Sequence, residues 1–334
     1  MYKLAIIGAG AISESHLKAC VQLPGIRAVA IADVVPERAE AAGSRYGIQA
    51  YGDYRRMVEQ EKPDIVAITL PHFLHKPAAV WCAEHGCHLM LEKPMALNAK
   101  ECDEIMDAVE SNGVRLLVGH TQHYIPENRA AKQLLDRGDL GELLTIQDTR
   151  HVDYYLDTRP AWFFEQAKSG GGIMMNLGSH SIDKIQWLTD SRVASLHGRV
   201  ARPGHKGDIE GSGVVFLLTS TGLPATITQS GYGGVNRNET ELLFTGGMLK
   251  LVTGRSLWIS EGGAYREIPV DKGKDPFILQ YEDLIDSIQR GVDPECSGSY
   301  GRSVIAAVEA IYESDRTGGQ VAVPINDRQR EEPA

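Results

Sequence analysis

Apolar residues in the first third of the chain come in short runs that are separated by turns and amphipathic segments. The apolar runs over residues 4–7 and 89–91, and the segment 65–70 in which only Thr69 is polar, are typical of strands that are buried on both faces. Segments with helical spacing lie between them, as at residues 76–84. Strands that alternate with helices predict a parallel, doubly wound sheet. We therefore expect residues 1–122 to form one nucleotide-binding domain.

From residue 124 the pattern changes to alternating or apolar strands joined by short turns that contain glycine. Strands are expected at residues 143–155, 214–219, 225–230, 241–245, 248–252 and 257–260. Hairpin turns such as Thr221-Gly222 predict a large, mainly antiparallel sheet. Helices over 126–137, 277–290 and 299–314 are expected to gather on one face of it. We expect an α/β chain whose second domain, residues 123–330, is α+β with an open-faced sheet.

A glycine turn follows the first apolar run. Gly8-Ala9-Gly10-Ala11-Ile12-Ser13 stands between a strand and a predicted helix, which is the context that a dinucleotide fingerprint requires. Gly8 permits the turn and Gly10 lets the backbone approach a pyrophosphate. The helix N-terminus, with Ala11 and Ile12, offers unpaired N–H groups to it. The first domain is therefore expected to be a Rossmann domain.

Asp33 ends the next predicted strand and bears on the choice of cofactor. An acid at this position hydrogen-bonds a ribose 2′-hydroxyl and repels a 2′-phosphate. We therefore expect NAD, with NADP less favoured. Arg38, a turn into the following helix, leaves the second cofactor open.

The stretch His88-Leu89-Met90-Leu91-Glu92-Lys93-Pro94 reads as a short strand that ends in an acid, a base and a proline. Proline disfavours helical geometry at Lys93, so the lysine stays at a strand's carboxyl end, where such sheets bind ligands. Thr69-Leu70-Pro71-His72 ends a strand at the same edge, and His75 follows one turn later. We expect Thr69, Leu70, His72, His75, Glu92 and Lys93 to border the cofactor. The alternative for each histidine is an ordinary loop residue.

Three glycines, Gly170-Gly171-Gly172, precede a segment with helical spacing. Asn176, His180 and Asp183 lie four and three residues apart and are expected to share one helix face. An amide, an imidazole and a carboxylate on a buried-looking helix are costly without a purpose. The alternative is that they cap and pair with neighbouring loops, and Asp183 in particular is expected to support the helix or orient a neighbour.

Composition narrows the choice of partner and location. The 334 residues carry 34 Lys and Arg against 44 Asp and Glu, a net charge of −10 that argues against nucleic acid and anionic membranes. The run before Gly8 is too short for a signal peptide, and no apolar run reaches membrane-spanning length. Five scattered cysteines are typical of reduced thiols, so we expect a cytoplasmic protein. Cys82, His85, Cys87 and His88 lack zinc-finger spacing, and we expect no metal site.

The glycine turn, Glu92-Lys93-Pro94 and the glycine-rich run ending in His180-Ser181-Ile182-Asp183 together resemble the Gfo/Idh/MocA family of sugar and inositol oxidoreductases. The resemblance extends over nearly the whole chain, including Arg159-Pro160-Ala161-Trp162. It implies a Rossmann domain that binds NAD(P) and a second domain that supplies the substrate site and oligomer contacts, here of a homodimer or homotetramer. It also implies that Lys93 contacts cofactor and substrate hydroxyls. The family usually carries Asp-x-x-x-His with the histidine as acid/base; here the histidine is His180, but Asn176 takes the place of the aspartate.

We therefore expect hydride transfer between NAD(H) and a secondary hydroxyl or keto carbon of a sugar, sugar derivative or cyclitol. His180 is expected to take the hydroxyl proton while Lys93 holds the same oxygen. Trp162 is expected to shelter the nicotinamide or, alternatively, to be a core residue. The residues expected to bind the substrate are Gln122, His123, His151, Tyr155, Asn176 and His180. Two alternatives stay open: a non-catalytic NAD- and sugar-binding sensor, and an enzyme that recycles a tightly held cofactor.

Overall fold

The computed structural model describes residues 1–203 and 206–324 and divides into two compact units. The first unit contains residues 1–121 and 274–302, and the second contains residues 122–273 and the chain from 303 onward. We expected one boundary near residue 122. This division has a boundary there, but it also assigns residues 274–302 to the first unit. Among the described residues, no helix is both long and apolar enough to cross a membrane.

The first unit is built on a six-stranded parallel sheet of order β3-β2-β1-β4-β5-β6. Its strands are β1 (Tyr2–Ile7), β2 (Ile26–Ala32), β3 (Gln49–Tyr51), β4 (Ile65–Ile68), β5 (His88–Leu91) and β6 (Leu116–Val118). Leu4, Ile65 and Leu89 in the central strands are all 0% exposed, as expected for a sheet covered on both faces. The predicted Rossmann fold is confirmed, and the carboxyl ends of β1, β4 and β5 lie at one edge of the sheet.

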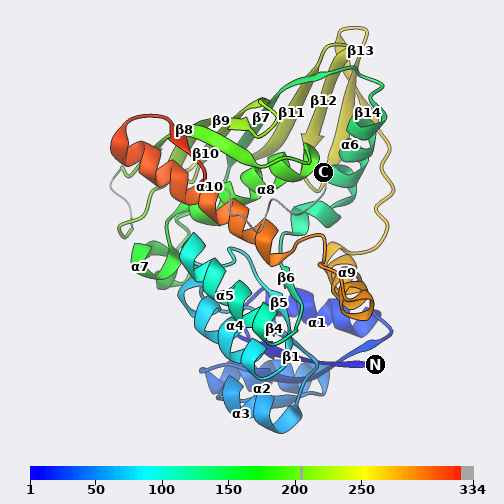
Figure 1. The fold of residues 1–334 in the computed structure, drawn as a ribbon, viewed down its shortest axis with the longest axis vertical. Helices are drawn as coiled ribbons and strands as arrows, with labels where there is room; N and C mark the ends of the chain where they lie inside the picture. The colour runs from blue at the N-terminus through cyan, green and yellow to red at the C-terminus, as the bar shows by residue number, and fades with distance from the viewer. Residues whose placement is uncertain (204–205, 325–334) are drawn as a thin grey trace. The chain divides into compact units, whose positions relative to one another are not determined.

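Helices connect these strands (Figure 1). They are α1 (Ser13–Gln22), α2 (Pro36–Tyr46), α3 (Tyr54–Glu61), the 3₁₀ turn η1 (His72–Leu74), α4 (His75–Glu84) and α5 (Ala99–Ser111). Polar residues cap the starts of two of them. The Asp53 carboxylate accepts from the Arg55 N–H, and the Asn98 side chain accepts from the Glu101 N–H.

Helix α9 (Pro276–Arg290) belongs to the first unit, although its sequence position suggested the second sheet. It packs against α1, and Figure 1 shows the two helices side by side. Its buried positions Ile278, Tyr281 and Leu284 recur every three to four residues and so form one apolar face. This helix brings residues from the last quarter of the chain to the nucleotide-binding unit.

The second unit is built on a nine-stranded sheet of order β14-β13-β12-β11-β7-β10-β9-β8-β15. Its strands are β7 (Leu143–His151), β8 (Val193–Ala201), β9 (Ser212–Thr219), β10 (Pro224–Ser230), β11 (Arg237–Phe244), β12 (Gly247–Val252), β13 (Ser256–Glu261), β14 (Ala264–Ile268) and β15 (Val321–Ala322). The expected, mainly antiparallel sheet is confirmed, with β7 and β10 as a parallel pair. The strand expected over residues 143–155 ends at His151, and the sequence patterns did not predict β8 or β14.

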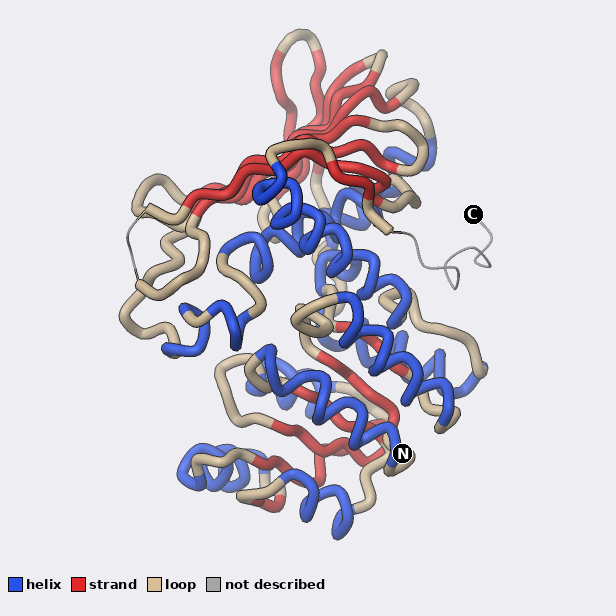
Figure 2. The backbone as a smooth tube through the Cα atoms, turned by 60° about the vertical axis from the view of Figure 1, so that its left-hand side comes forward, coloured by secondary structure: helices blue, strands red, loops and turns tan. Residues whose placement is uncertain are grey.

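Helices of this unit lie along one face of the sheet (Figure 2). The helical segments are η2 (Thr121–Tyr124), α6 (Pro126–Arg137), η3 (Ala161–Phe164), α7 (Gln166–Ser169), the π-helix η4 (Met174–Gly178), α8 (Ser179–Leu188) and α10 (Gly298–Thr317), whose first residues belong to the first unit. On β9, Val215 and Leu217 are buried while Val214 and Phe216 are 56% and 48% exposed. The strand therefore presents apolar side chains on its open face.

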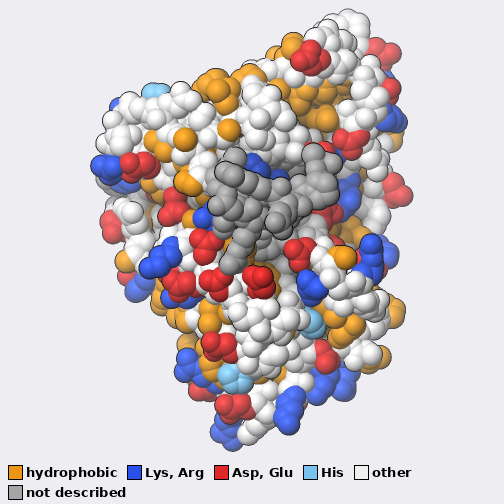
Figure 3. All heavy atoms as spheres, in the orientation of Figure 1, with side chains coloured by type: hydrophobic (Ala, Val, Ile, Leu, Met, Phe, Trp, Pro, Cys, Tyr) orange, Lys and Arg blue, Asp and Glu red, His pale blue; other side chains and the backbone are white. Residues whose placement is uncertain are grey.

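Charged side chains do not gather by sign on the face seen in Figure 3. Acidic and basic groups are interspersed there, with no continuous basic surface in view.

Candidate active site

The turn after β1 requires a glycine at its first position. Gly8 has a φ of +98°, and a Cβ there would lie 2.7 Å from the Thr69 carbonyl oxygen. The Thr69 hydroxyl donates to the Gly8 carbonyl at 2.7 Å and so joins the carboxyl ends of β1 and β4. Gly10, Ala11 and Ile12 are exposed, and a Cβ at Gly10 would meet nothing within 4 Å. The turn leaves an open backbone cradle ahead of α1, which fits a dinucleotide pyrophosphate.

Asp33 follows β2 and ties the glycine turn to the next loop. Its Oδ2 accepts from the Ala9 N–H and its Oδ1 from the Val35 N–H, each at 2.8 Å. An ionised carboxylate has about four lone-pair sites, so it can also accept from a ribose hydroxyl next to the turn. The residues predicted at β1 and β2 are thus brought together by direct hydrogen bonds.

Two histidines follow the carboxyl end of β4. His72 is 5% exposed, and its ring centroid lies 5.8 Å from that of His75. In the fully buried His75, Nε2 lies 2.8 Å from the Leu70 carbonyl oxygen and Nδ1 lies 2.8 Å from the Pro94 carbonyl oxygen. Burial lowers the pKa of His75, while the hydrogen bonds to the Leu70 and Pro94 carbonyls act in the opposite direction. His75 therefore joins the loop after β4 to the Glu-Lys-Pro segment.

Glu92 and Lys93 follow β5 at the same edge of the sheet. The Glu92 side chain is 11% exposed, and its Oε1 lies 3.2 Å from His16 Nε2. His16 Nδ1 in turn lies 2.8 Å from the Tyr281 hydroxyl oxygen. Burial opposes ionisation of Glu92, but the His16 hydrogen bond and the charge of Lys93 hold the pKa of this carboxyl below its ordinary value. Glu92 is an ionised carboxylate beside Lys93.

His16 and Tyr281 are absent from the residues that the sequence singled out. His16 lies three residues after Ser13 and four before Cys20 in α1, and this helical spacing was a signal that its ring is internal. Tyr281 shares helical spacing with Ile278 and Leu284, which indicates an internal ring, but its partner could not be predicted because His16 lies 265 residues away in the sequence. Only the packing of α9 on α1 brings the two together.

In the second unit, a buried carboxylate fixes the turn that precedes the predicted site helix. Glu210 is 1% exposed and accepts from the N–H groups of Gly172 at 2.8 Å and Met174 at 2.9 Å. The Tyr312 hydroxyl donates to it at 2.8 Å. A Cβ at Gly172 would lie 1.9 Å from the Glu210 carbonyl oxygen, so glycine is required there. These contacts set the start of η4, a type of turn that is frequent at functional sites.

Asn176 lies in η4 and His180 in the first turn of α8. Asn176 is 7% exposed, and its side-chain amide donates to the Tyr154 hydroxyl at 3.2 Å. Burial raises the pKa of Tyr154 to about 12, so this group is a neutral phenol. His180 is partly exposed. The predicted helix is present, but its first turn is π rather than α, which changes the angular relation of Asn176 and His180 that the spacing predicted.

A buried ion pair attaches α8 to the sheet. Lys184 Nζ lies 2.8 Å from Asp148 Oδ2, and their side chains are 2% and 1% exposed. Asp148 also accepts from the hydroxyls of Ser181 and Thr240. Burial opposes ionisation of Asp148, but the Lys184 charge and these hydrogen bonds hold its pKa below the ordinary value. The helix that carries His180 is thereby tied to β7 and β11.

Asp183 contacts His123, one of the predicted substrate-binding residues. His123 Nε2 lies 2.7 Å from Asp183 Oδ1, and their side chains are 1% and 0% exposed. The His123 ring stacks on Trp187 with centroids 4.9 Å apart. Asp183 therefore orients a neighbour, as the sequence led us to expect. The adjacent Gln122 is also buried, and its side-chain oxygen accepts from the Asn128 amide at 3.2 Å.

The remaining candidates lie on the segment that follows β7. His151 ends the strand, opposite Ser230 of β10. The Tyr155 ring stacks on those of Phe164 and Tyr232, with centroids 5.8 Å and 5.5 Å apart. The partly exposed Trp162 stacks on its neighbour Phe163 at 3.8 Å. Both Tyr155 and Trp162 make packing contacts and stay partly exposed. For Trp162 this is compatible with a contact to the nicotinamide and also with a place in the core.

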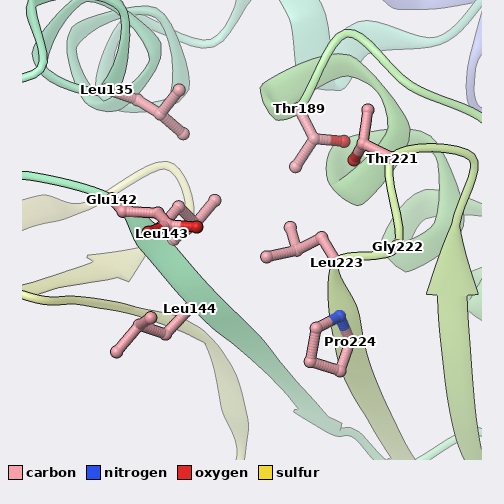
Figure 4. A pocket seen from close by; sticks show the side chains of 9 residues that line it. All are labelled: Leu135, Glu142, Leu143, Leu144, Thr189, Thr221, Gly222, Leu223 and Pro224. Atoms are coloured by element: carbon pink, nitrogen blue, oxygen red, sulfur yellow. The ribbon is translucent and has the colours of Figure 1, made fainter.

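Two further features are separate from these residues. Within residues 1–203 and 206–324, no group of three or more His, Cys, Asp or Glu is placed to hold a metal ion. The second unit contains a pocket of about 420 Å³, and none of the side chains that line it, drawn in Figure 4, is a predicted site residue. It is lined by Leu135, Glu142, Leu143, Leu144, Thr189, Thr221, Gly222, Leu223 and Pro224.

Comparison with known proteins places both units in one family. Residues 2–120 match the model described as oxidoreductase family, NAD-binding Rossmann fold, and residues 128–250 match the GFO/IDH/MocA C-terminal domain. An inositol 2-dehydrogenase of Salmonella paratyphi B is 26% identical over 97% of each chain.

Solved structures show the same fold. An aldose-aldose oxidoreductase from Caulobacter crescentus has a TM-score of 0.89 at 24% identity, over 96% of this chain and 99% of that one. A levoglucosan dehydrogenase in complex with NADH and levoglucosan has a TM-score of 0.89 at 22% identity, over 97% and 100% of the two chains. The chain belongs to the Gfo/Idh/MocA family of oxidoreductases and carries its NAD-binding Rossmann domain.

Proposed function

We propose that the protein is an NAD-dependent dehydrogenase or reductase that acts on a secondary hydroxyl or keto carbon of a sugar, sugar derivative or cyclitol. The observation that carries the proposal is the ionised Glu92 beside Lys93, at the sheet edge that also holds the glycine cradle. The inositol and levoglucosan dehydrogenases among the similar proteins support the substrate class.

We propose that the glycine turn, with Gly8, Gly10, Ala11 and Ile12, surrounds the pyrophosphate and that Asp33 accepts from the adenosine ribose. When bound, the nicotinamide supplies the hydride acceptor. Residues that follow β4 and β5 are proposed to border the nicotinamide end, and Trp162 is a further candidate for the same contact. The residues after β4 and β5 are Thr69, Leu70, His72, His75, Glu92 and Lys93.

Replacing Asp33 by serine is expected to lower kcat/KM with NAD and to raise it with NADP, so that their ratio changes by about tenfold or more. The carboxylate favours a ribose hydroxyl and opposes a 2′-phosphate, and a like-charge contact costs on the order of several kcal/mol. Initial rates with each cofactor measure the ratio. Glu40→Gln removes an exposed acid from α2 and is the control. A ratio that Asp33→Ser leaves unchanged rules out the proposed ribose contact.

We propose that His180 takes the hydroxyl proton as the hydride leaves the same carbon. The ordinary pKa of histidine, ~6.5, suits a general base near neutral pH. Lys93 is proposed to donate to the reacting oxygen and to stabilise the negative charge that develops there. In the reverse direction the same two residues return the proton and polarise the carbonyl.

We propose that polar groups of the second unit orient the other hydroxyls of the substrate. Besides His180, they are Gln122, His123, His151, Tyr155 and Asn176. Asn176 stands where the family usually has an aspartate, and its amide can both donate to and accept from a sugar hydroxyl. This exchange removes one negative charge near His180, but it keeps the capacity to hydrogen-bond.

A screen of NAD reduction over sugars, inositols and sugar acids tests the proposal. We expect NADH to form with at least one polyol, and kcat to fall in Lys93→Ala. NAD binding without turnover on any member of the panel favours the non-catalytic sensor instead. NADH absorbance that stays with the protein through dialysis identifies the third possibility, a cofactor that is held and recycled.

We further propose a homodimer or homotetramer in the cytoplasm. The exposed Val214 and Phe216 on β9 form an apolar surface that a second copy of the chain can cover. All five cysteines are free and buried, which suits a reducing compartment. Sedimentation velocity measures the number of subunits.

A further inference from the structure

A chain of three buried polar groups runs behind Lys93 in the first unit. It joins Glu92, at the end of β5, to His16 of α1 and to Tyr281 of α9, over distances of 3.2 Å and 2.8 Å. His16 and Tyr281 are both 0% exposed. We propose that Tyr281 and His16 are positioning residues that keep Glu92 ionised and fixed, so that Glu92 holds Lys93 in place and in its charged form. This inference rests on the role proposed above for Lys93.

The hydrogen atoms in this chain can be assigned from the chemistry of its two ends. The ionised Glu92 carboxylate can only accept, so His16 Nε2 carries a hydrogen and donates it. Burial, and the nearby Cys20 and Glu92, raise the pKa of the Tyr281 phenol well above its ordinary value, so this group keeps its proton. The phenol can then donate to Nδ1 of the His16 ring. Tyr281 thus selects the tautomer in which the imidazole faces Glu92 with an N–H.

Packing leaves the His16 ring little freedom. Its ring meets those of Phe277 and Tyr281 edge to face, with centroids 5.1 Å and 5.7 Å away. Both aromatic residues lie on α9, so this helix determines where the imidazole sits. A ring held in this way gives its hydrogen bond to Glu92 a defined direction.

The Glu92 carboxylate is enclosed from several sides. Its Oε2 accepts from the N–H of Lys93 at 3.2 Å, and a Cβ at Gly119 would come within 3.4 Å of Oε1. The charged or titratable groups that act on it are His16 from α1, His75 from α4, and Lys93. The hydrogen bond and charge of His16, together with the charge of Lys93, act to lower the pKa of Glu92. The carboxylate therefore links His16 to Lys93, the residue that we place at the reacting oxygen.

Such a chain is costly for a fold that needs only to pack two helices. Burying a hydroxyl, an imidazole and a carboxylate costs free energy, which apolar side chains at the α1–α9 contact would avoid. Buried groups with perturbed pKa values, linked to a specific charge partner, are a mark of functional sites. Here the hydrogen-bonded series Tyr281, His16 and Glu92 ends beside Lys93. A positioning role for these groups accounts for their burial.

The proposal is tested by the reactivity of Lys93, measured without turnover. Only the neutral amine is acylated, so the labelling rate of Lys93 by acetic anhydride, followed by peptide mass spectrometry, reports its protonation. In Glu92→Gln the lysine loses its anionic neighbour, and we expect labelling at pH 8 to be about tenfold faster, since an opposite charge nearby changes a pKa by roughly 1–3 units. We expect Tyr281→Phe and His16→Ala to change the rate in the same direction and by less.

Turnover provides the second readout. When the hydrogen bond from His16 to Glu92 is lost or weakened, the pKa of Glu92 rises. We therefore expect the acid limb of the kcat/KM profile to move to higher pH in His16→Ala and Tyr281→Phe. We expect kcat to fall while the dissociation constant of NAD stays within about twofold. His16→Gln keeps an N–H that can reach the carboxylate, and we expect it to restore part of the loss seen in His16→Ala.

Tyr46→Phe is a matched control. The Tyr46 hydroxyl, at the end of α2, donates at 2.8 Å to Glu14, which lies on α1 as His16 does. This variant also removes a hydrogen bond from a tyrosine hydroxyl, and we expect it to leave the labelling rate of Lys93 and the pH profile of kcat/KM unchanged. A Lys93 labelling rate that is equal in wild type and in Glu92→Gln overturns the proposal, even if His16→Ala fails to fold. Full activity of Lys93→Ala would instead refute the proposed catalytic role of the lysine and leave the labelling result intact, so the two failures are distinguishable.

Discussion

Replacing His180 by alanine is expected to lower kcat by about 10²-fold or more and to leave the affinity for NAD unchanged. A positioned general base contributes typically 10²–10⁴-fold to the rate, and the variant has no group to take the hydroxyl proton. The helix should persist, because Lys184 and Ser181 bind Asp148 independently of the imidazole. Steady-state rates with the best substrate of the panel, together with NAD titration by fluorescence, measure the two effects.

His197→Ala is the control for His180→Ala, since His197 is an exposed histidine on β8. Its kcat should equal that of the wild type. In His180→Ala, exogenous imidazole should restore part of the rate if proton transfer is what was lost. A kcat within about threefold of the wild type, with the fold intact, removes His180 from the mechanism.

Replacing Lys184 by methionine is expected to destabilise the second unit by about 3–5 kcal/mol. This is the cost that follows when one partner of a buried ion pair is removed and the other charge stays uncompensated. The Asp148 carboxylate keeps its bonds to Ser181 and Thr240, but it loses the ammonium 2.8 Å away. Urea unfolding followed by tryptophan fluorescence measures the loss, because Trp187 lies on the same helix.

The loss in Lys184→Met should depend on pH. In the wild type the folded-state pKa of Asp148 is lowered, so its contribution is present above the ordinary carboxyl pKa and is lost as pH falls through the folded value. In the variant the buried carboxyl loses its nearest cation and keeps the charge of Arg150, so its pKa rises and protonation stabilises the fold. The difference between the two proteins should therefore shrink from pH 7 toward pH 4.

Lys168→Met is the control for this experiment. Its partner Glu165 lies 2.7 Å away, but the Lys168 side chain is 44% exposed. Exposed pairs are worth only about 0–1 kcal/mol, so this variant should unfold close to the wild type. A Lys184→Met protein that is as stable as Lys168→Met would mean that Asp148 is not ionised in the fold.

Features that depend on neighbouring residues could be predicted from the sequence. The apolar run, the glycine turn and α1 follow one another within about twenty residues, and the structure confirms their order. Asp53 and Asn98 cap helices because their side chains reach N–H groups two to three residues ahead. Asp33 lies beside the turn because parallel strands end at one edge of their sheet.

Features that depend on distant partners could not be predicted. The contact between His123 and Asp183 joins residues 60 apart, and that between His16 and Tyr281 joins residues 265 apart. The π turn at Asn176 is set by Glu210, which holds the N–H groups of Gly172 and Met174 from another segment. Strand β8 alternates too weakly to be recognised, because His197 and Arg199 face solvent while Gly198 fills a buried position.

The first unit is not made from one continuous stretch of chain, because residues 274–302 complete it after residues 122–273 have intervened. During synthesis, at about 5–20 residues per second, the ribosome needs about 8–30 seconds to make the intervening part. Throughout that interval the face of α1 that receives α9 stays open, and His16 has Glu92 but not Tyr281. The nucleotide-binding unit can therefore reach its final packing only late in translation, and until then the side of α1 that α9 covers is open to solvent and to chaperones.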